Sequence, residues 1–355
     1  MSFRRVAPTV HLRRSFSRLS IPVPPLVDVH RPGSVIPRAF GHPWAKFLVR
    51  RLLGLVGVVV ALVVAVFFML QLVPGDPILN AIGDASAPAR VAELKHQYHL
   101  DGPLLKQFTY YVQRLLHGDL GGTYVNPEPV TRIIKIGYAN SLQLAGAGLA
   151  LALFVGIAGG MLAAALTHEG RHPRFELVFL TVTSVLGSIP DYLMATFFVF
   201  LFGVRLRWLP VAGAGSLDQL ILPAVAISTH SMATLARVVR VETLNVLAQD
   251  YIRTARSDRL PKRTIYLRHV LPNALTAALT YGGLVFANIF GAAVIVEVVF
   301  NRTGLGSELV SAVLQKELAV VQGITLILGV TIVLMNLAVD IILALLDPRS
   351  LARPS

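Results

Sequence analysis

Few side chains in this sequence could do chemistry, and those that could stand alone in apolar surroundings. Asp191 follows Pro190 inside an apolar stretch, where an ionisable group is costly and marks a functional site by default. It either lines a polar path and meets an amine, or lies at a helix end or a water-filled break. His230 suits a polar contact between helices better than a proton relay, and Asp340 suits packing or capping.

Catalytic, metal and nucleotide chemistry find no support in the residue pattern. His168 and His172 are four apart, but Pro173 follows at once and the His-Glu-x-x-His order is missing. The chain has no cysteine, which excludes disulfides and thiolate metal sites. A Gly-x-x-x-x-Gly-Lys-Ser/Thr loop, a nucleophile elbow and a convergent carboxylate set are also missing. The sequence therefore predicts no metal, no catalytic residue and no cofactor bound by this chain.

The composition is that of a membrane protein. Hydrophobic residues make up 54% of the 355 residues and charged residues only 14%, whereas a soluble domain carries about 25% charged residues. The net charge of +13 could indicate nucleic-acid binding. The basic residues instead flank apolar runs and form no folded patch, so we expect no nucleic-acid partner.

Six apolar runs are long enough, or nearly so, to cross a bilayer as helices, which takes about 20 residues each. The runs are residues 52–73, 136–167, 177–204, 219–236, 274–296 and 318–346. The third run is interrupted by Pro190 and Asp191, and the fourth contains Pro223 and His230. We therefore expect an all-α polytopic membrane protein with six transmembrane helices and both chain ends on one side.

The distribution of Lys and Arg indicates which side that is, because basic residues collect in cytoplasmic segments. Residues 1–51 hold ten Lys/Arg and one acid, and residues 237–272 hold eight Lys/Arg and three acids. The long segment 74–135 is balanced, with six of each. The first two segments are therefore expected in the cytoplasm and the third outside.

These observations predict the organisation of the chain. A basic, disordered cytoplasmic extension covers residues 1–45 and could touch anionic lipid. The six-helix membrane domain covers residues 46–347, with an external loop at 74–135 and a cytoplasmic loop at 237–272. A cytoplasmic tail covers residues 348–355. The first apolar run is too long for the core of a cleavable signal peptide and is expected to be a retained helix.

The cytoplasmic loop contains a short polar segment of helix length that Pro261 is expected to stop. Tyr251 and Ala255 are four apart and share a face. Three arginines at intervals of three form a second, basic stripe: Arg253, Arg256 and Arg259. Such a helix suits docking to a soluble partner. On charge alone, an ordinary positive-inside loop explains the segment better.

The order of residues in this loop resembles the EAA loop of permeases of ABC importers, in the form found in the peptide/nickel family. That family has approximately Asp-Tyr-Val-Arg-Thr-Ala-Arg-Ala-Lys-Gly-Leu, followed by a His-x-Leu/Arg-Pro/Asn-Asn-Ala element. The matching positions here are Asp250, Tyr251, Arg253, Thr254, Ala255, Arg256, Arg259, Leu260, His269, Leu271 and Pro272. Arg259 stands where the family has glycine. Because the spacing to His269 is kept, we expect the left-handed turn that glycine takes there.

The resemblance extends along nearly the whole chain beyond its first residues. Further matching pieces are residues 72–77, 100–103, 115–121, 188–190, 222–224, 297–300, 304–306, 321–323 and 345–349. Each piece is weak alone, but their order and spacing together are similar to the B-type permease of dipeptide and oligopeptide importers.

The resemblance implies a type I ABC importer permease in the cytoplasmic membrane of a bacterium, which moves peptides by alternating access. It further implies a second, homologous permease, two cytoplasmic ATPase subunits that bind ATP and Mg, and an extracytoplasmic substrate-binding protein. Residues 253–260 would be the coupling helix. The amphipathic stretch 104–116 would lie in the outer loop. Dipeptides, longer peptides, nickel chelates and haem share this pattern, so the substrate stays open.

We assign Ser188, Pro190 and Asp191 to a candidate translocation path. The alternative is a secondary transporter or channel for small solutes that works alone. Such a protein is expected to carry paired ionisable groups deep in several spans, and only Asp191 and His230 approach that. A third reading, an intramembrane enzyme, lacks candidate catalytic residues.

Overall fold

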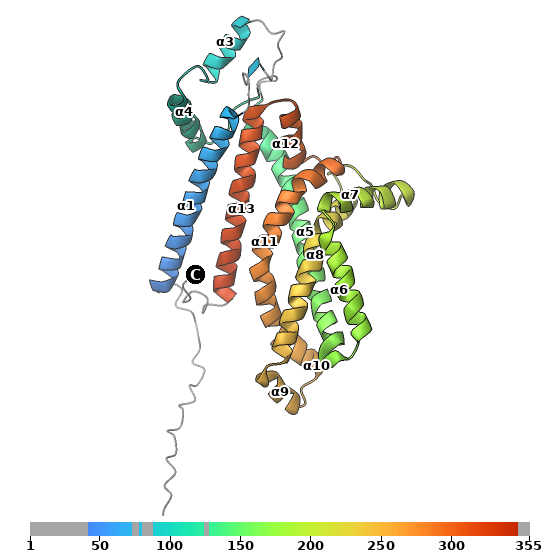
Figure 1. Ribbon diagram of the computed structural model, residues 1–355. Helices are drawn as coiled ribbons and strands as arrows, with labels where there is room; N and C mark the ends of the chain where they lie inside the picture. The colour runs from blue at the N-terminus through green and yellow to red at the C-terminus, as the bar shows by residue number, and fades with distance from the viewer. Residues whose placement is uncertain (1–41, 73–77, 80–87, 124–127, 347–355) are drawn as a thin grey trace, which may run out of the picture. The chain divides into compact units, whose positions relative to one another are not determined.

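A computed structural model describes residues 42–72, 78–79, 88–123 and 128–346 (Figure 1). Within these residues all regular secondary structure is helical, and the sole β-type pairing is an isolated bridge between Gly122 and Pro129. Residues 1–41 of the predicted extension, the predicted tail 348–355, residues 73–77 of the matching piece 72–77 and residues 347–349 of the matching piece 345–349 lie outside the described residues. The all-α class predicted from the apolar runs is confirmed.

The described helices follow one another along the chain. They are α1 (His42–Gln71), α3 (Pro88–Gln97), α4 (Leu104–Leu116), α5 (Val130–Thr167), α6 (Pro173–Ser188), α7 (Asp191–Phe198), α8 (Asp218–Leu247), α9 (Asp250–Ser257), α10 (Lys262–Thr264), α11 (Leu271–Val299), α12 (Leu305–Leu314) and α13 (Leu318–Leu346). A 3₁₀ turn, η1 (His168–Gly170), follows α5, and π-helical turns η2 (Val199–Arg205) and η3 (Ile265–Val270) follow α7 and α10.

Five described helices are long and apolar enough to cross a membrane: α1, α5, α8, α11 and α13. The third predicted run, 177–204, changes direction, because α6 and the helix that starts at Asp191 meet at an angle of 97°. Ile189 is extended, with φ −82° and ψ 123°, as expected for a residue before proline. Pro190 also lacks the N–H that a continuous helix would need. The count reaches six spans when this bent pair is taken as one.

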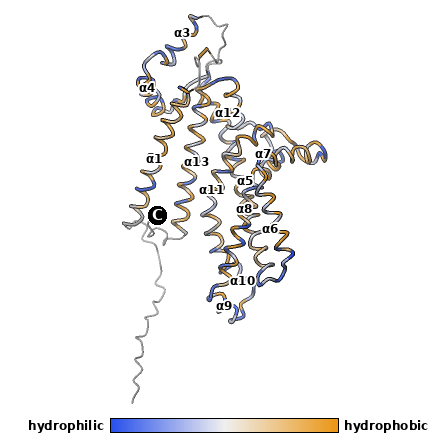
Figure 2. Tube along the Cα trace, in the orientation of Figure 1, coloured by the Kyte–Doolittle hydropathy of each residue, from blue (hydrophilic) through white to orange (hydrophobic). Residues whose placement is uncertain are grey.

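Helix α8 packs against α5, α6, α7 and α11. Glycines of α5 allow the close approach of α8: a Cβ at Gly160 would lie 2.5 Å from the carbonyl oxygen of Ala236. A buried cluster from α5, α8 and α11 fills the interior, including the stacked rings of Phe286 and Phe290. Figure 2 shows hydrophobic residues along α1 and α13 and hydrophilic residues at α9.

The start of α1 and the end of α13 lie at the same end of the helices (Figure 1), joined by an ion pair of 3.1 Å between Arg51 and Asp340. Asp340 therefore contacts α1, and the packing or capping role expected for it stays a prediction. The predicted external loop contains α3 and α4, and α4 has the bounds of the predicted amphipathic stretch. Residues 130–135 belong to α5, and residues 237–247 continue α8, so both predicted loops are shorter than expected.

Candidate functional site

The segment between α8 and α11 folds into a short helix, α9, that has its own supports. Helix α8 ends at Leu247, and Gln249 has an extended backbone before α9 begins. Asp250 lies in the first turn of α9 and Arg256 in the last, which matches the helix dipole. Arg253 Nη1 forms an ion pair of 3.2 Å with Asp250 Oδ1.

One face of α9 is buried against the protein. Ile252 is fully buried and Ala255 is 7% exposed, whereas Tyr251 is 46% exposed. The buried face of α9 is therefore formed by Ile252 and Ala255, while Tyr251 lies at its edge. The two buried residues form one apolar cluster with the segments beneath α9, and its members are Val246, Leu247, Ile252, Ala255, Ile265 and Val270. Burial of one such isoleucine side chain is worth about 2 kcal/mol, which fixes α9 to the ends of α8 and η3.

Tyr251 joins the two halves of the motif recognised in the sequence. The side-chain amide of Asn273 donates a hydrogen bond of 3.3 Å to the hydroxyl oxygen of Tyr251 and one of 2.8 Å to the carbonyl of His269. His269 lies in η3, and Leu271 and Pro272 form the first turn of α11. Proline is tolerated in a first turn because its missing N–H would have no helical partner there.

The C-terminus of α9 is closed by backbone hydrogen bonds around Arg259. The N–H of Leu260 donates to the carbonyl of Ala255 at 3.2 Å, and the N–H of Arg259 donates to the carbonyl of Arg256 at 3.0 Å. This pair is the Schellman motif, and Arg259 has the φ of 54° that it requires. The predicted left-handed conformation is confirmed. The expectation that Pro261 stops the helix is wrong, because α9 ends at Ser257 and Pro261 precedes α10.

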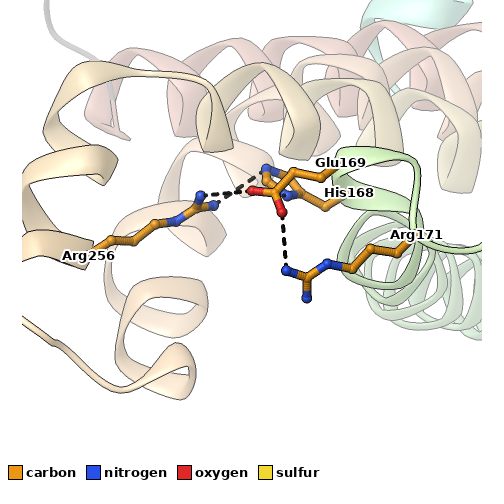
Figure 3. A network of polar contacts seen from close by, with 4 residues as sticks. All are labelled: His168, Glu169, Arg171 and Arg256. Atoms are coloured by element: carbon orange, nitrogen blue, oxygen red, sulfur yellow. Dashed lines mark hydrogen bonds and ion pairs between the residues drawn. The ribbon is translucent and has the colours of Figure 1, made fainter.

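Arg256 contacts the protein's own link between α5 and α6 (Figure 3). Its guanidinium lies 3.5 Å from Glu169 Oε1 and 3.4 Å from His168 Nε2. Arg171 pairs with the other oxygen of Glu169 at 3.1 Å. The basic stripe predicted on α9 is thus divided: Arg256 faces the link, while the side chain of Arg253 is 73% exposed.

Beside this link the pKa of Tyr266 is raised above its ordinary value, because the effect of burial exceeds the lowering by the charges of Arg256 and Arg171.

Sequence reasoning missed the roles of Glu169, Ile252 and Asn273. The signals available were a single acid in a short basic link, an isoleucine in a polar segment, and an asparagine directly after the motif's proline.

The candidate path residues lie at the break between α6 and α7. Ser188 ends α6 and donates to the carbonyl of Ser184 at 2.8 Å, Pro190 is extended, and Asp191 opens α7. Asp191 Oδ1 is buried and has no hydrogen-bond partner among the described residues. His230 of α8 lies close enough to interact with Asp191 electrostatically.

Metal chemistry has no site in the part of the chain that the structure describes, where no group of three or more His, Asp or Glu side chains could hold an ion. The residues described above can bind a partner and can transmit movement from one helix to another. An exposed helix face lies at one end of the bundle, and a buried carboxylate lies at a break in the helices.

Two family descriptions match this chain. Residues 156–351 match the "Binding-protein-dependent transport system inner membrane component" family, and residues 44–140 match the N-terminal region of such membrane components. The first match contains α6 to α13, and the second contains α3, α4 and α1 from its third residue on.

Curated relatives match along nearly their full length. A putative peptide transport system permease protein of Brucella suis is 34% identical over 310 residues, covering 85% of this chain and 98% of the relative. The glutathione transport system permease protein GsiC of Shigella flexneri is 34% identical, covering 85% and 98%. The oligopeptide transport system permease protein OppB of Escherichia coli is 32% identical, covering 86% and 98%.

Among solved structures, an inward-facing conformation of the MetNI methionine ABC transporter is similar in fold. The TM-score is 0.54 at 17% sequence identity, and the match covers 62% of this chain and all of the MetNI chain. The likeness supports the arrangement of helices and says nothing of the substrate.

Proposed function

The chain belongs to the family of binding-protein-dependent transport system inner membrane components, and from this premise we propose that it is the permease subunit of an ATP-driven importer of peptides. It is a multi-pass inner membrane protein and not itself an enzyme, so ATP is hydrolysed on separate subunits. The relatives named for peptide, glutathione and oligopeptide transport support peptides as the substrate class.

The observation that carries the proposal is the position and anchoring of α9. Its buried face, Ile252 and Ala255, rests on the ends of α8 and η3. Its opposite side presents Arg253 and Ser257 to solvent. A helix held in this way can receive a push from a docked partner and pass it to α8 and α11, which reach the core of the bundle. Rigid-body movement of packed helices is an established way to switch access. We propose α9 as the contact with an ATPase subunit.

The remaining partners follow from the same proposal. A second, homologous permease completes the translocation path, two ATPase subunits bind ATP and Mg, and a substrate-binding protein delivers the peptide from outside. We place the start of α1, the end of α13, the α5–α6 link and α9 on the cytoplasmic side, because the basic segments of the sequence lie at this end. Asp191, with His230 beside it, is placed on the peptide path.

The decisive experiment is purification and reconstitution of the chain together with its partners. We expect ATPase subunits to co-purify in mild detergent, and the proteoliposomes to take up labelled peptide when ATP and the binding protein are supplied. Arg253→Glu should reduce the recovery of ATPase several-fold, because it reverses the charge of the exposed face of α9. Lys106→Glu, an exposed charge reversal on α4, is the control and should leave that recovery unchanged.

The outcome that contradicts the proposal is uptake driven by an ion gradient alone. If the chain moves solute without ATP and without ATPase subunits, it is a secondary transporter, and α9 has another role.

A further inference from the structure

The link between α5 and α6 contains two consecutive residues in the left-handed region. Glu169 has a φ of 61° and Gly170 a φ of 71°. Glycine adopts this conformation freely, but glutamate does so at a cost in free energy because its Cβ approaches the backbone. The contacts of the Glu169 side chain should therefore explain why a glutamate occupies this position.

The carboxylate of Glu169 is the centre of a small charged network (Figure 3). Arg171 lies 3.1 Å from Oε2, while Arg256 at 3.5 Å and His168 Nδ1 at 3.3 Å approach Oε1. The side chain of Glu169 is 52% exposed. Ion pairs this exposed contribute little to stability, so stability alone is a poor reason to keep a glutamate in a strained backbone.

The network connects α9 to a unit that is already fixed. Arg240 of α8 is 7% exposed. It forms an ion pair with Glu176 of α6 and a hydrogen bond of 3.2 Å to the hydroxyl of Thr167, at the end of α5. These contacts hold the adjacent ends of α5, α6 and α8 together. The pair between Glu169 and Arg256 adds α9 to this group through residues 87 positions apart in the sequence.

We propose that Glu169 is a positioning residue that ties α9 to the α5–α6 link, so that a displacement of α9 reaches α5 and α6 as well as α8 and α11. This inference rests on the proposed function, in which α9 receives the movement of an ATPase. The left-handed backbone aims the carboxylate across the gap to α9, which is why the strain at residue 169 is retained.

The first test separates coupling from stability. Glu169→Gly relieves the backbone and removes the carboxylate. The expected result is a thermal stability equal to or above that of the parent, normal assembly with the ATPases, and a several-fold fall in peptide taken up per ATP hydrolysed. Arg171 also pairs with this carboxylate but makes no ion pair with α9. Arg171→Gln should therefore leave the ratio of uptake to ATP hydrolysis unchanged. Unaltered coupling in Glu169→Gly would overturn the inference.

The second test asks whether exchanging the two charges restores coupling between uptake and ATP hydrolysis. Glu169→Arg and Arg256→Glu should each lower the ratio of uptake to hydrolysis, and the double exchange should recover most of it. A double exchange no better than the single variants would count against the pair.

The third test uses the absence of native cysteine. Cysteines at positions 169 and 256 remove the ion pair and should lower the uptake of peptide per ATP, and a short flexible cross-linker between them should raise it again because the two sites move together. A further loss of uptake on cross-linking, reversed when a cleavable linker is cut, would show that the two sites must separate and would refute the inference. Failure of the proposed function looks different, since the parent complex itself would then show no ATP-driven uptake.

Discussion

The hydroxyl of Ser141 on α5 donates a hydrogen bond of 2.6 Å to the carboxylate of Glu297 on α11, and Glu297 is fully buried. The other carboxylate oxygen accepts the N–H of Gly306 at 2.7 Å, and the hydroxyl oxygen of Ser141 accepts the N–H of Leu305 at 2.8 Å. Both N–H groups belong to the first turn of α12. The two side chains therefore cap α12 and hold it against α5 and α11.

The first prediction concerns this buried cap. Glu297→Gln replaces one acceptor oxygen with a donor that faces other donors, so at least one buried group loses its partner. We expect a loss of about 1–3 kcal/mol in the free energy of unfolding, measured by thermal unfolding of the chain in mild detergent. Glu93→Gln, at a side chain that is 66% exposed, should change stability by less than about 0.5 kcal/mol. Equal effects of the two variants would contradict the capping role.

The helices could be predicted because hydrophobicity over a membrane-length window is a local property of the sequence. The run 318–346 corresponds to α13, Leu318–Leu346. The contacts of Glu297 could not be predicted in this way, because Ser141 is 156 residues away and an acid near the end of an apolar run has no visible partner. The direction of α7 also depends on packing, since a proline reveals a break but not the angle.

In the candidate site, sequence reasoning worked where the backbone was constrained locally. The left-handed turn at Arg259 followed from the family's glycine and from the spacing to His269. The end of α9 was misplaced because the hydrogen bonds of Leu260 and Arg259 close the helix before Pro261. The buried face could not be predicted, because two residues four apart define a stripe on a helix but not which stripe meets the protein. That choice is made by Ile265 and Val270 of η3.

The second prediction concerns Arg259, whose φ is 54°. Arg259→Gly should be neutral or stabilising by up to about 1 kcal/mol, because glycine pays no steric cost there and its greater freedom when unfolded offsets part of the gain. Arg259→Val should be destabilising, because a β-branched residue is strained at positive φ. Peptide-stimulated ATPase activity of the assembled complex should stay at or above that of the parent for the glycine variant. A several-fold loss with normal assembly would show that the arginine side chain itself contacts the ATPase.

The third prediction concerns topology. Thr109 on α4 and Ser257 on α9 are both exposed, and the chain has no native cysteine to interfere. A cysteine at Thr109 should react with an impermeant thiol reagent added outside intact cells. A cysteine at Ser257 should react only after the membrane is opened. The reverse pattern would invert the orientation inferred from the Lys/Arg distribution.

The fourth prediction concerns the candidate path. Asp191→Asn keeps the size of the side chain and removes the charge that could bind the free amino terminus of a peptide. Uptake of a peptide with a free amino terminus should fall several-fold, while uptake of its acetylated form should change little. Asp340→Asn is the matched control, because Asp340 pairs with Arg51 at the ends of α1 and α13 and any effect should be equal for both peptides. An equal loss for both peptides in Asp191→Asn would remove this residue from the path.

The last prediction concerns the contact between α5 and α8, which uses two adjacent glycines in different ways. A Cβ at Gly160 would lie 2.5 Å from the carbonyl oxygen of Ala236 and 2.8 Å from Val239 Cβ, whereas a Cβ at Gly159 would meet nothing within 4 Å. Gly160→Ala must therefore push α5 and α8 apart, at a cost of about 1–3 kcal/mol. Gly159→Ala should be neutral or stabilising by up to about 1 kcal/mol, since alanine favours the helix.

Thermal unfolding of the two alanine variants in detergent measures this difference directly. Because α8 leads through Gln249 into α9, the displacement caused by Gly160→Ala should also lower peptide uptake per ATP, while Gly159→Ala should leave that ratio unchanged. If both variants behave alike, α5 and α8 are not in the close contact on which the support of α9 depends.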